Sequence, residues 1–171
     1  PQRFMNLYGS PNLVRNDHMC AYPVFISENL TYGQNTVYGP DGDLARCILL
    51  WGSNPATSHI PFIWQDVLKA KRRGAKIIVI DPRRTAAAAQ ADLHVSLRPG
   101  TDAALALGLL NVIIGERLYD ADFVARWTVG FEQLAERVTP YTPEAVAGIT
   151  GVPAEMVRKV ARLYATTRPG Y

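Results

Sequence analysis

The fold is decided by Ile48-Leu49-Leu50-Trp51-Gly52-Ser53-Asn54-Pro55 and, after a helical segment, by Lys76-Ile77-Ile78-Val79-Ile80-Asp81-Pro82-Arg83-Arg84-Thr85. Each run begins as a short, continuous apolar segment and ends in turn or polar residues, which is typical of a strand buried on both faces. Between them a helical pattern gives one apolar face, made by Ile60, Ile63, Trp64, Val67 and Leu68. The stretch predicts strand, turn, helix, strand and turn. Both turns are then expected at the carboxyl end of a parallel sheet, where open α/β sheets bind ligands.

The α/β pattern continues downstream. Residues 85–91, mostly alanine, predict a small helical turn, and residues 93–97 predict a third strand that a Pro-Gly pair stops. Thr101 can cap the next helix, with Asp102 in its first turn. Because residues 103–114 are apolar nearly all round, we expect that helix to be buried.

The two ends of the chain carry the remaining elements. Residues 1–19 show no clear periodicity, and the runs 9–12 and 15–18 within them are typical of loops, as are residues 33–43. Residues 20–32 predict a short helix, provided that Pro23 lies in its first turn. The last third predicts short helices at 120–127 and 131–138, one starting at Thr142-Pro143 and one opened by Pro153. The fold prediction is therefore α/β, a Rossmann-like parallel sheet with helices on both faces. We expect one domain over 1–171, with a core at 44–115 and a helical extension at 116–171.

Composition bounds the class of protein. The 171 residues are 48% apolar and 19% charged, as in an ordinary globular domain, and the net charge of +3 is too small to indicate nucleic-acid binding. No apolar run reaches membrane-spanning length. Cys20 and Cys47 do not make a disulfide framework, and neither a CxxC pair nor HExxH occurs. The chain begins at Pro1 without a Met, so we expect an excised piece.

Each predicted strand ends in residues that suit a nucleotide. The first turn, residues 52–55, leads into a helix N-terminus that can receive a phosphate. Asp81 ends the second strand, where dinucleotide folds bind ribose hydroxyls, and Arg83 and Arg84 can pair with phosphate. Asp102, in the third turn, could accept from a base ring N–H and an exocyclic amine together, which favours guanine.

A plainer interpretation exists for each of these residues. Gly52 and Asn54 could only turn the chain, and Asp102 could only complement the helix dipole. The pattern also lacks GxGxxG, so an ordinary NAD site is weakly supported. The residues alone leave these alternatives open, although their expected placement at one end of a sheet favours the functional interpretation.

At these residues the chain resembles the molybdopterin oxidoreductases of the dimethyl sulfoxide reductase family. The resemblance rests on ordered segments, namely 51–59, 69–85, 98–105, 118–120, 141–144 and 149–152. It extends from about residue 9 to the end of the chain. It implies a molybdenum or tungsten ion bound through two molybdopterin guanine dinucleotides.

The resemblance also implies residue roles. The phosphates of a pterin dinucleotide would be bound by the turn that contains Gly52, Ser53, Asn54 and His59. The ribose and phosphate would contact Asp81 and Arg83, and the guanine would contact Gly100 and Asp102. Cys20 matches the position of the metal's protein ligand, and a thiolate suits a metal already bound by sulfur.

Some cysteine and histidine positions limit this assignment. For a lone cysteine a small buried thiol is the commoner case, but the position of Cys20 within the family pattern favours the metal ligand. Cys47 is interpreted as a packing residue. Formate dehydrogenases usually have His directly after the metal ligand, whereas Ala21 follows here, which argues against formate oxidation. His18 is not an equivalent, since loop histidines are commonly only solvated.

The resemblance covers one part of a larger enzyme, because the other halves of the cofactor site and the iron–sulfur cysteine motif of many members are absent from these residues. We expect the rest of the same polypeptide as partner, without nucleic acid or a membrane span. An iron–sulfur cluster elsewhere and an electron-transfer subunit are compatible with the resemblance, and no compartment is implied. The first hypothesis is a cofactor-binding domain of a two-electron oxidoreductase whose isolated fragment is inactive. The alternative is a stand-alone nucleotide-binding module without catalysis.

Overall fold

The computed structural model describes residues 2–13, 21–33 and 39–171. Packing divides the chain into two units, Pro1–Tyr38 and Gly39–Tyr171. The first unit contains α1 (Gln2–Tyr8) and α2 (Ala21–Tyr32), and Pro23 lies in the first turn of α2 as predicted. The sequence gives no clear periodicity over residues 1–19, and α1 was not predicted. Phe4 and Tyr8 lie at helical spacing within it, and their rings stack with centroids 6.0 Å apart.

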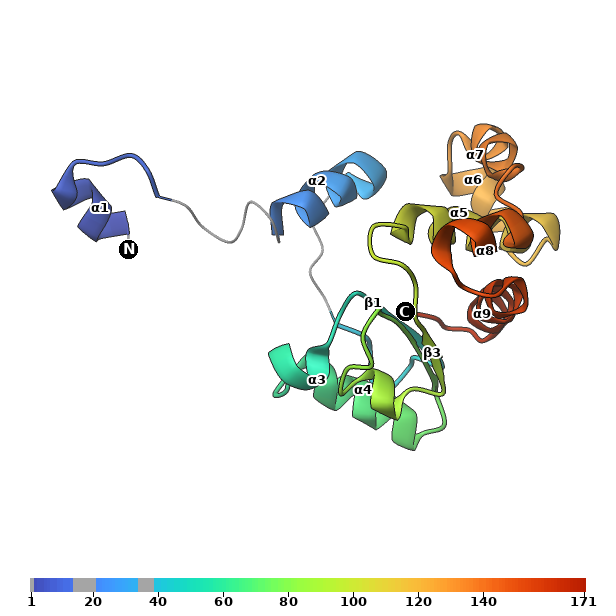
Figure 1. Ribbon diagram of the computed structural model, residues 1–171, viewed down its shortest axis with the longest axis horizontal. Helices are drawn as coiled ribbons and strands as arrows, with labels where there is room; N and C mark the ends of the chain where they lie inside the picture. Colours follow the sequence, from blue (N-terminus) through green and yellow to red (C-terminus); the bar gives the residue numbers. More distant parts are fainter. Residues whose placement is uncertain (1, 14–20, 34–38) are drawn as a thin grey trace. The chain divides into compact units, whose positions relative to one another are not determined.

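The second unit is built on a parallel sheet, shown in Figure 1. Its strands are β1 (Cys47–Trp51), β2 (Lys76–Ile80) and β3 (Leu93–Val95), in the order β1-β2-β3. Trp51 pairs with Ile80, and Ile80 pairs with Val95. Because these last residues lie in one row, the turns that follow all leave from the same end of the sheet. The predicted α/β architecture is confirmed.

The connection from β1 to β2 contains two helices rather than one. The four-residue α3 (Pro55–Ser58) follows the first turn, and α4 (Ile63–Arg72) runs back along the sheet. The prediction that Ile60 shares the apolar helical face is wrong, since it lies before α4 and is 49% exposed. Ile60 precedes Pro61, and the residue before a proline is disfavoured in the α conformation. Gly74, at φ +93°, follows the end of α4 as expected of a terminating glycine.

Helices cover both faces of the sheet, as predicted. Alternate residues of β1 point to opposite sides. On one face Ile48, Leu50, Ile77 and Val79 pack with Trp64, Val67 and Ala70 of α4. On the other face Cys47, Ile78, Ile80, Leu93 and Val95 pack with residues of α5, α8 and α9. The core therefore has two layers separated by the sheet.

The remaining elements follow the predicted order. After the short 3₁₀ turn η2 (Ala88–Gln90) and β3 come α5 (Asp102–Gly115), α6 (Ala121–Trp127), α7 (Phe131–Val138), α8 (Pro143–Thr150) and α9 (Ala154–Thr166). Thr142 caps α8 by accepting from Ala145 N–H at 3.2 Å. Thr101 holds the N-cap position of α5, but its hydroxyl donates to Arg98 O at 2.6 Å, so the expected side-chain cap is absent. Only one side of α5 is fully buried, around Leu105 and Leu109.

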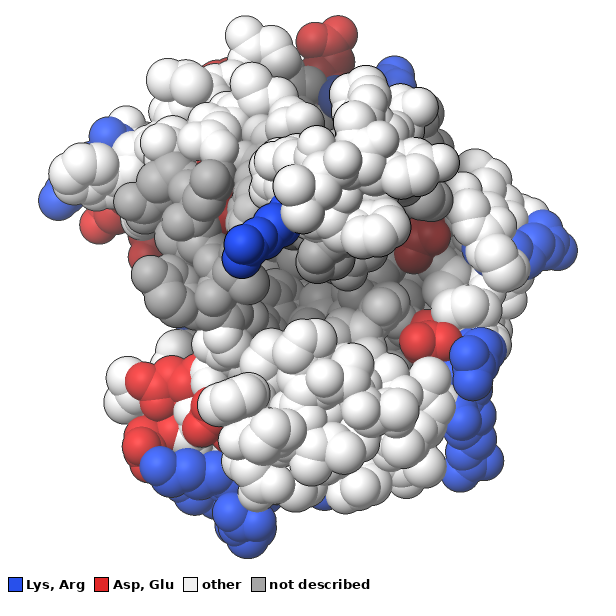
Figure 2. All heavy atoms as spheres, turned by 90° about the vertical axis from the view of Figure 1, so that its left-hand side faces the viewer, with Lys and Arg blue, Asp and Glu red and all other residues white. Residues whose placement is uncertain are grey.

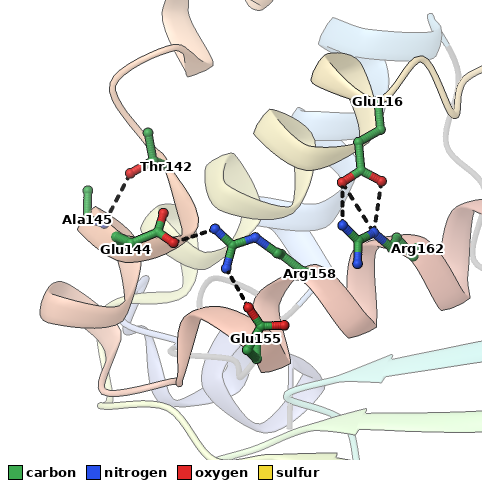
Figure 3. A network of polar contacts seen from close by, with 7 residues as sticks. All are labelled: Glu116, Thr142, Glu144, Ala145, Glu155, Arg158 and Arg162. Atoms are coloured by element: carbon green, nitrogen blue, oxygen red, sulfur yellow. Dashed lines mark hydrogen bonds and ion pairs between the residues drawn. The ribbon is translucent and has the colours of Figure 1, made fainter.

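Ion pairs tie α9 to its neighbours (Figure 3). Arg162 binds Glu116, just beyond α5, through Nε and Nη2, with Nη2 2.8 Å from Oε1. Arg158 pairs with Glu144 of α8 and with Glu155 of its own helix. These bonds hold the pKa values of Glu116 and Glu144 below the usual range for glutamate.

The C-terminal residues lie beside β1. Gly170 forms a parallel bridge with Cys47, Tyr171 N–H donates to Cys47 O at 2.9 Å, and Leu49 N–H donates to Tyr171 O at 2.7 Å. This segment covers the lateral edge of β1 that β2 leaves open. In the described parts of the chain, no helix combines the length and apolar character that a membrane crossing requires. On the face drawn in Figure 2, acidic and basic side chains form small groups between wide uncharged areas.

Candidate functional site

Three turns meet at the carboxyl end of the sheet and form the candidate site. The first turn is residues 52–55 after β1, the second is 81–85 after β2, and the third is 98–102 before α5. Because the last residues of β1, β2 and β3 are in register, these turns lie beside one another as predicted from the sequence. Apart from Cys20 and His59, every predicted site residue belongs to one of them.

Gly52 opens the first turn in a conformation that favours glycine. Its φ is +57°, and its N–H donates to Ile80 O at 2.8 Å, which closes the turn onto β2. No heavy atom lies within 4 Å of where a Cβ would stand, and both Gly52 and Ser53 are exposed. A ligand could therefore approach the backbone of this turn closely.

Asn54 braces the first turn against the second. Its Oδ1 accepts from Ala87 N–H at 3.3 Å, and its Nδ2 donates to Thr57 Oγ1 at 2.9 Å. Asn54 is half-buried, so both ends of the amide have protein partners. Asn54 lies in the first turn, and its side chain connects this turn to Ala87 in the segment that follows the second turn.

The helix that follows the first turn is shorter than the sequence predicts. With four residues, α3 carries little of the dipole that would attract a phosphate, and α4 begins only at Ile63. His59 ends α3, is exposed, and has Nδ1 2.8 Å from Ser58 Oγ. Phosphate binding here would therefore depend on exposed backbone and side-chain groups rather than on a long helix.

The second turn is shaped by Asp81. Its Oδ1 accepts from Arg83 N–H at 2.7 Å, which folds the carboxylate over the backbone of the turn. The side chain is half-buried, whereas Arg83 and Arg84 are exposed. Neither guanidinium forms an ion pair or hydrogen bond with any other described residue. Both arginines are therefore available to an anionic ligand.

Two side chains of β3 and its continuation also support the second turn. His94 Nε2 lies 2.9 Å from Asp81 O, and Ser96 Oγ donates to Pro82 O at 3.1 Å. The sequence reasoning missed these residues, although their spacing of two in a strand places them on one face. That spacing, beside two carbonyls at the end of β2, is the signal that could have indicated them.

The third turn contains Gly100 and Asp102. Gly100 has φ +81° and is exposed. Asp102 is exposed at the first position of α5, and its Oδ1 accepts from the indole N–H of Trp51 at 2.8 Å. Arg98 anchors the turn to the end of α8 by donating to Gly148 O at 2.8 Å and to Ile149 O at 3.1 Å. Trp51 was not among the predicted site residues.

The predicted metal ligand, Cys20, lies outside the described residues, as does His18. Among the residues that are described, no group of three or more His, Cys, Asp and Glu side chains could hold a metal ion. Cys47 is fully buried in the core, and this burial, with Asp92 nearby, raises the pKa of its thiol to about 11. Its interpretation as a packing residue is confirmed.

Most of the candidate residues that the structure describes are exposed, so their side chains lie at the surface. A groove of about 610 Å³ lies between α5, α9 and the C-terminal segment, and no candidate residue lines it. At the three turns, the donor set fits a dinucleotide: open glycine backbone, exposed Arg83 and Arg84 for phosphate, and the carboxylates of Asp81 and Asp102 for hydroxyl or amine donors.

Comparison with known proteins identifies the family and several relatives of the chain. A family model described as molybdopterin oxidoreductase matches residues 2–158. Acetylene hydratase of Syntrophotalea acetylenica is 45% identical over 168 residues, which are 98% of this chain and 23% of that protein. Formate dehydrogenase H of Escherichia coli is 48% identical over 126 residues, 74% of this chain and 18% of that protein. The solved structure of acetylene hydratase from Pelobacter acetylenicus superposes with a TM-score of 0.85 at 44% identity, covering 99% of this chain and 23% of that one. The chain thus spans about a quarter or less of the length of these relatives.

Proposed function

The chain belongs to the molybdopterin oxidoreductase family, and on this premise we propose that it is the part of a larger oxidoreductase that binds a molybdopterin guanine dinucleotide. The observation that carries the proposal is the meeting of the three turns at one end of the sheet, with phosphate-type and base-type partners side by side. Open α/β sheets hold ligands at the carboxyl ends of their strands, which is where these turns lie.

Each turn has a separate task in this proposal. The backbone of Gly52, with Ser53 and His59, faces the phosphates together with the guanidinium of Arg83. Asp81 accepts from ribose hydroxyls, and its bond from Arg83 N–H keeps the carboxylate in place. Asp102 and the open backbone at Gly100 face the guanine. Asn54 ties the first turn to the segment that follows the second turn.

The bound group would supply two-electron redox chemistry at molybdenum or tungsten, which no side chain of this sequence can supply. The contribution of the chain is to hold and orient the dinucleotide, and Cys20 is the proposed protein ligand of the metal. An iron–sulfur cluster and an electron-transfer subunit would belong to other parts of the enzyme.

The substrate is a separate matter from the cofactor. Two similar proteins are named for different reactions, a hydration of acetylene and an oxidation of formate. In this proposal the three turns hold a dinucleotide, and none of their residues is assigned to a substrate. Ala21 after Cys20 is the feature that argues against formate oxidation.

The experiment is to purify the full-length protein, measure molybdenum and tungsten per polypeptide by mass spectrometry, and extract the bound nucleotide. We expect about one metal ion per polypeptide, and we expect the extracted nucleotide to carry guanine. Asp102→Ala should lower retention and weaken the preference for guanine over the cytosine form, whereas Asp81→Ala should lower retention of both forms alike. Asp122→Ala, an exposed aspartate of α6, removes the same charge away from the turns and serves as control.

Two results would contradict the proposal. Absence of metal and of pterin in the full-length protein would favour the alternative, a nucleotide-binding module without catalysis. Unchanged guanine content in the Asp102 variant would mean that this carboxylate only begins α5. The isolated 171-residue chain is expected to fold without turning over substrate, and measurable reductase activity of that chain would refute this part.

A further inference from the structure

Trp51 holds the carboxylate of Asp102, the last residue of the third turn, through its indole N–H. We propose that Trp51 is a specificity-determining positioning residue, whose indole N–H fixes which atom of residue 102 faces the base of the bound dinucleotide. This inference rests on the proposed function, and it adds a residue that neither the turn chemistry nor the family resemblance assigns to the base.

The geometry joins two distant parts of the chain. Trp51 Nε1 donates to Asp102 Oδ1 at 2.8 Å, across a separation of 51 positions. Trp51 is the last residue of β1 and is half-buried against the core on the α5 side of the sheet. Asp102 is the exposed first residue of α5. A ring held by the core thus fixes a carboxylate that lies at the surface.

The chemistry of the bond determines its consequence. An indole N–H can only donate, so the atom of residue 102 that faces Trp51 has to be an acceptor. In Asp102, Oδ1 takes this bond, and Oδ2 accepts no hydrogen bond from the described residues. Oδ2 and the remaining lone pair of Oδ1 are left for the base. Because the acceptor is charged, the bond is stronger than a neutral one and keeps the side chain in one orientation.

An Asp102→Asn variant would test this constraint, because an amide has one acceptor atom and one donor group. In an Asp102→Asn variant, Trp51 can hold only the amide oxygen, which turns the NH₂ group toward the base. The guanine edge presents N–H donors there and would face another donor, whereas cytosine presents the ring nitrogen and carbonyl oxygen as acceptors. Without the indole N–H the amide is free to rotate, and the discrimination between the two bases should weaken.

The experiment uses the full-length apoenzyme with an equal mixture of the guanine and cytosine dinucleotide forms, followed by extraction and counting of both nucleotides. Trp51→Phe keeps an aromatic ring but removes the donor, and we expect its guanine preference to fall by about tenfold, equivalent to about 1.4 kcal/mol. Asp102→Asn should take up more cytosine than guanine, and the double variant with Trp51→Phe should lose most of that reversal. Trp51→Phe combined with Asp102→Ala should match Asp102→Ala alone, since Trp51 acts through the carboxylate.

Trp64→Phe is the matched control, because Trp64 is a buried tryptophan of α4 on the opposite face of the sheet. It should keep the guanine preference whatever its effect on stability. If Asp102→Ala abolishes the guanine preference of the wild type and Trp51→Phe leaves it intact, the inference about Trp51 is overturned but the proposed function is not. If the wild-type protein takes up neither dinucleotide form, the proposed function itself is overturned. If Trp51→Phe fails to fold, the guanine-to-cytosine ratio taken up by Asp102→Asn tests the inference. Reversal toward cytosine supports the inference, and a retained guanine preference overturns it.

Discussion

Asn54 Oδ1 accepts a hydrogen bond from the backbone N–H of Ala87 at 3.3 Å, which joins the turn after β1 to the segment after β2. His94 and Ser96 support the second turn in the same manner, through the carbonyls of Asp81 and Pro82. The residues proposed to contact the cofactor are thus held in position by neighbours that need not touch it. Preorganisation of this kind lowers the entropic cost of binding.

We predict that Asn54→Ala weakens both folding and cofactor retention. The variant loses two hydrogen bonds, at about 0.5–1.5 kcal/mol each, and leaves the N–H of the buried Ala87 without its acceptor. The free energy of unfolding should fall by about 1–3 kcal/mol in urea titration. Retention of the dinucleotide by the full-length protein should fall in parallel.

Two variants separate the bonds of Asn54. Asn54→Asp keeps an acceptor for Ala87 N–H and should retain more cofactor than Asn54→Ala. Thr57→Val removes the Nδ2 partner only and should change retention little. Equal retention in Asn54→Ala and the wild type would show that the brace between the turns is not needed for binding.

The sequence predicts the strands and turns well because their signals are local. Continuous apolar runs that end in Gly or a charged residue define β1 and β2, and an alternating run stopped by Pro-Gly indicates β3, all without reference to the rest of the chain. The break between α3 and α4 also has a local cause, since Pro61 restricts Ile60, but the prediction followed the apolar spacing alone. The short α1 gives no comparable pattern.

The bond from Trp51 to Asp102 could not be predicted in this way. It depends on the positions of β1 and α5, whose partners are 51 residues apart, and on which side of the sheet the tryptophan faces. A single sequence contains the residue types at these positions but not their distance. The site residues were therefore predicted by position in the turns, and the residues that orient them were found only in the structure.

A second prediction concerns the packing of α5 on α8. A Cβ at Gly108 would lie 2.8 Å from Val146 Cγ2. Gly108→Ala should gain about 1 kcal/mol of helix propensity but lose about 1–3 kcal/mol to overpacking, so we expect net destabilisation in urea titration. Adding Val146→Ala should recover part of the loss. Gly115→Ala, where no atom lies within 4 Å of the new Cβ, should be neutral or stabilising. Destabilisation by Gly115→Ala alone would contradict this account.

Acid should weaken the attachment of α9. The hydrogen bond from Arg162 holds the pKa of Glu116 below its value of 4.5 in the unfolded chain. The pair therefore contributes stability above that pH, and the contribution is lost as the pH falls through the lower folded pKa. Glu116→Gln should show a shallower decline of the urea midpoint between about pH 5 and pH 2 than the wild type. Glu132→Gln, an exposed glutamate of α7 without an ion pair to any described residue, should follow the wild type.

The two cysteines should differ in reactivity. Cys47 is fully buried, and burial raises the pKa of its thiol to about 11, so at about pH 8 only about one thiol in a thousand is ionised. Cys20 is expected from its polar sequence neighbours to react as an accessible thiol. The isolated 171-residue chain, treated in its native state with iodoacetamide and analysed by peptide mass spectrometry, should be labelled at Cys20 only, and at both cysteines in denaturant. Because the reactive thiolate of Cys47 increases toward pH 11, its labelling should rise with pH only after that of Cys20 has reached its plateau. Equal labelling rates in the native protein would contradict the packing role of Cys47, and resistance of Cys20 would weaken its assignment as the metal ligand.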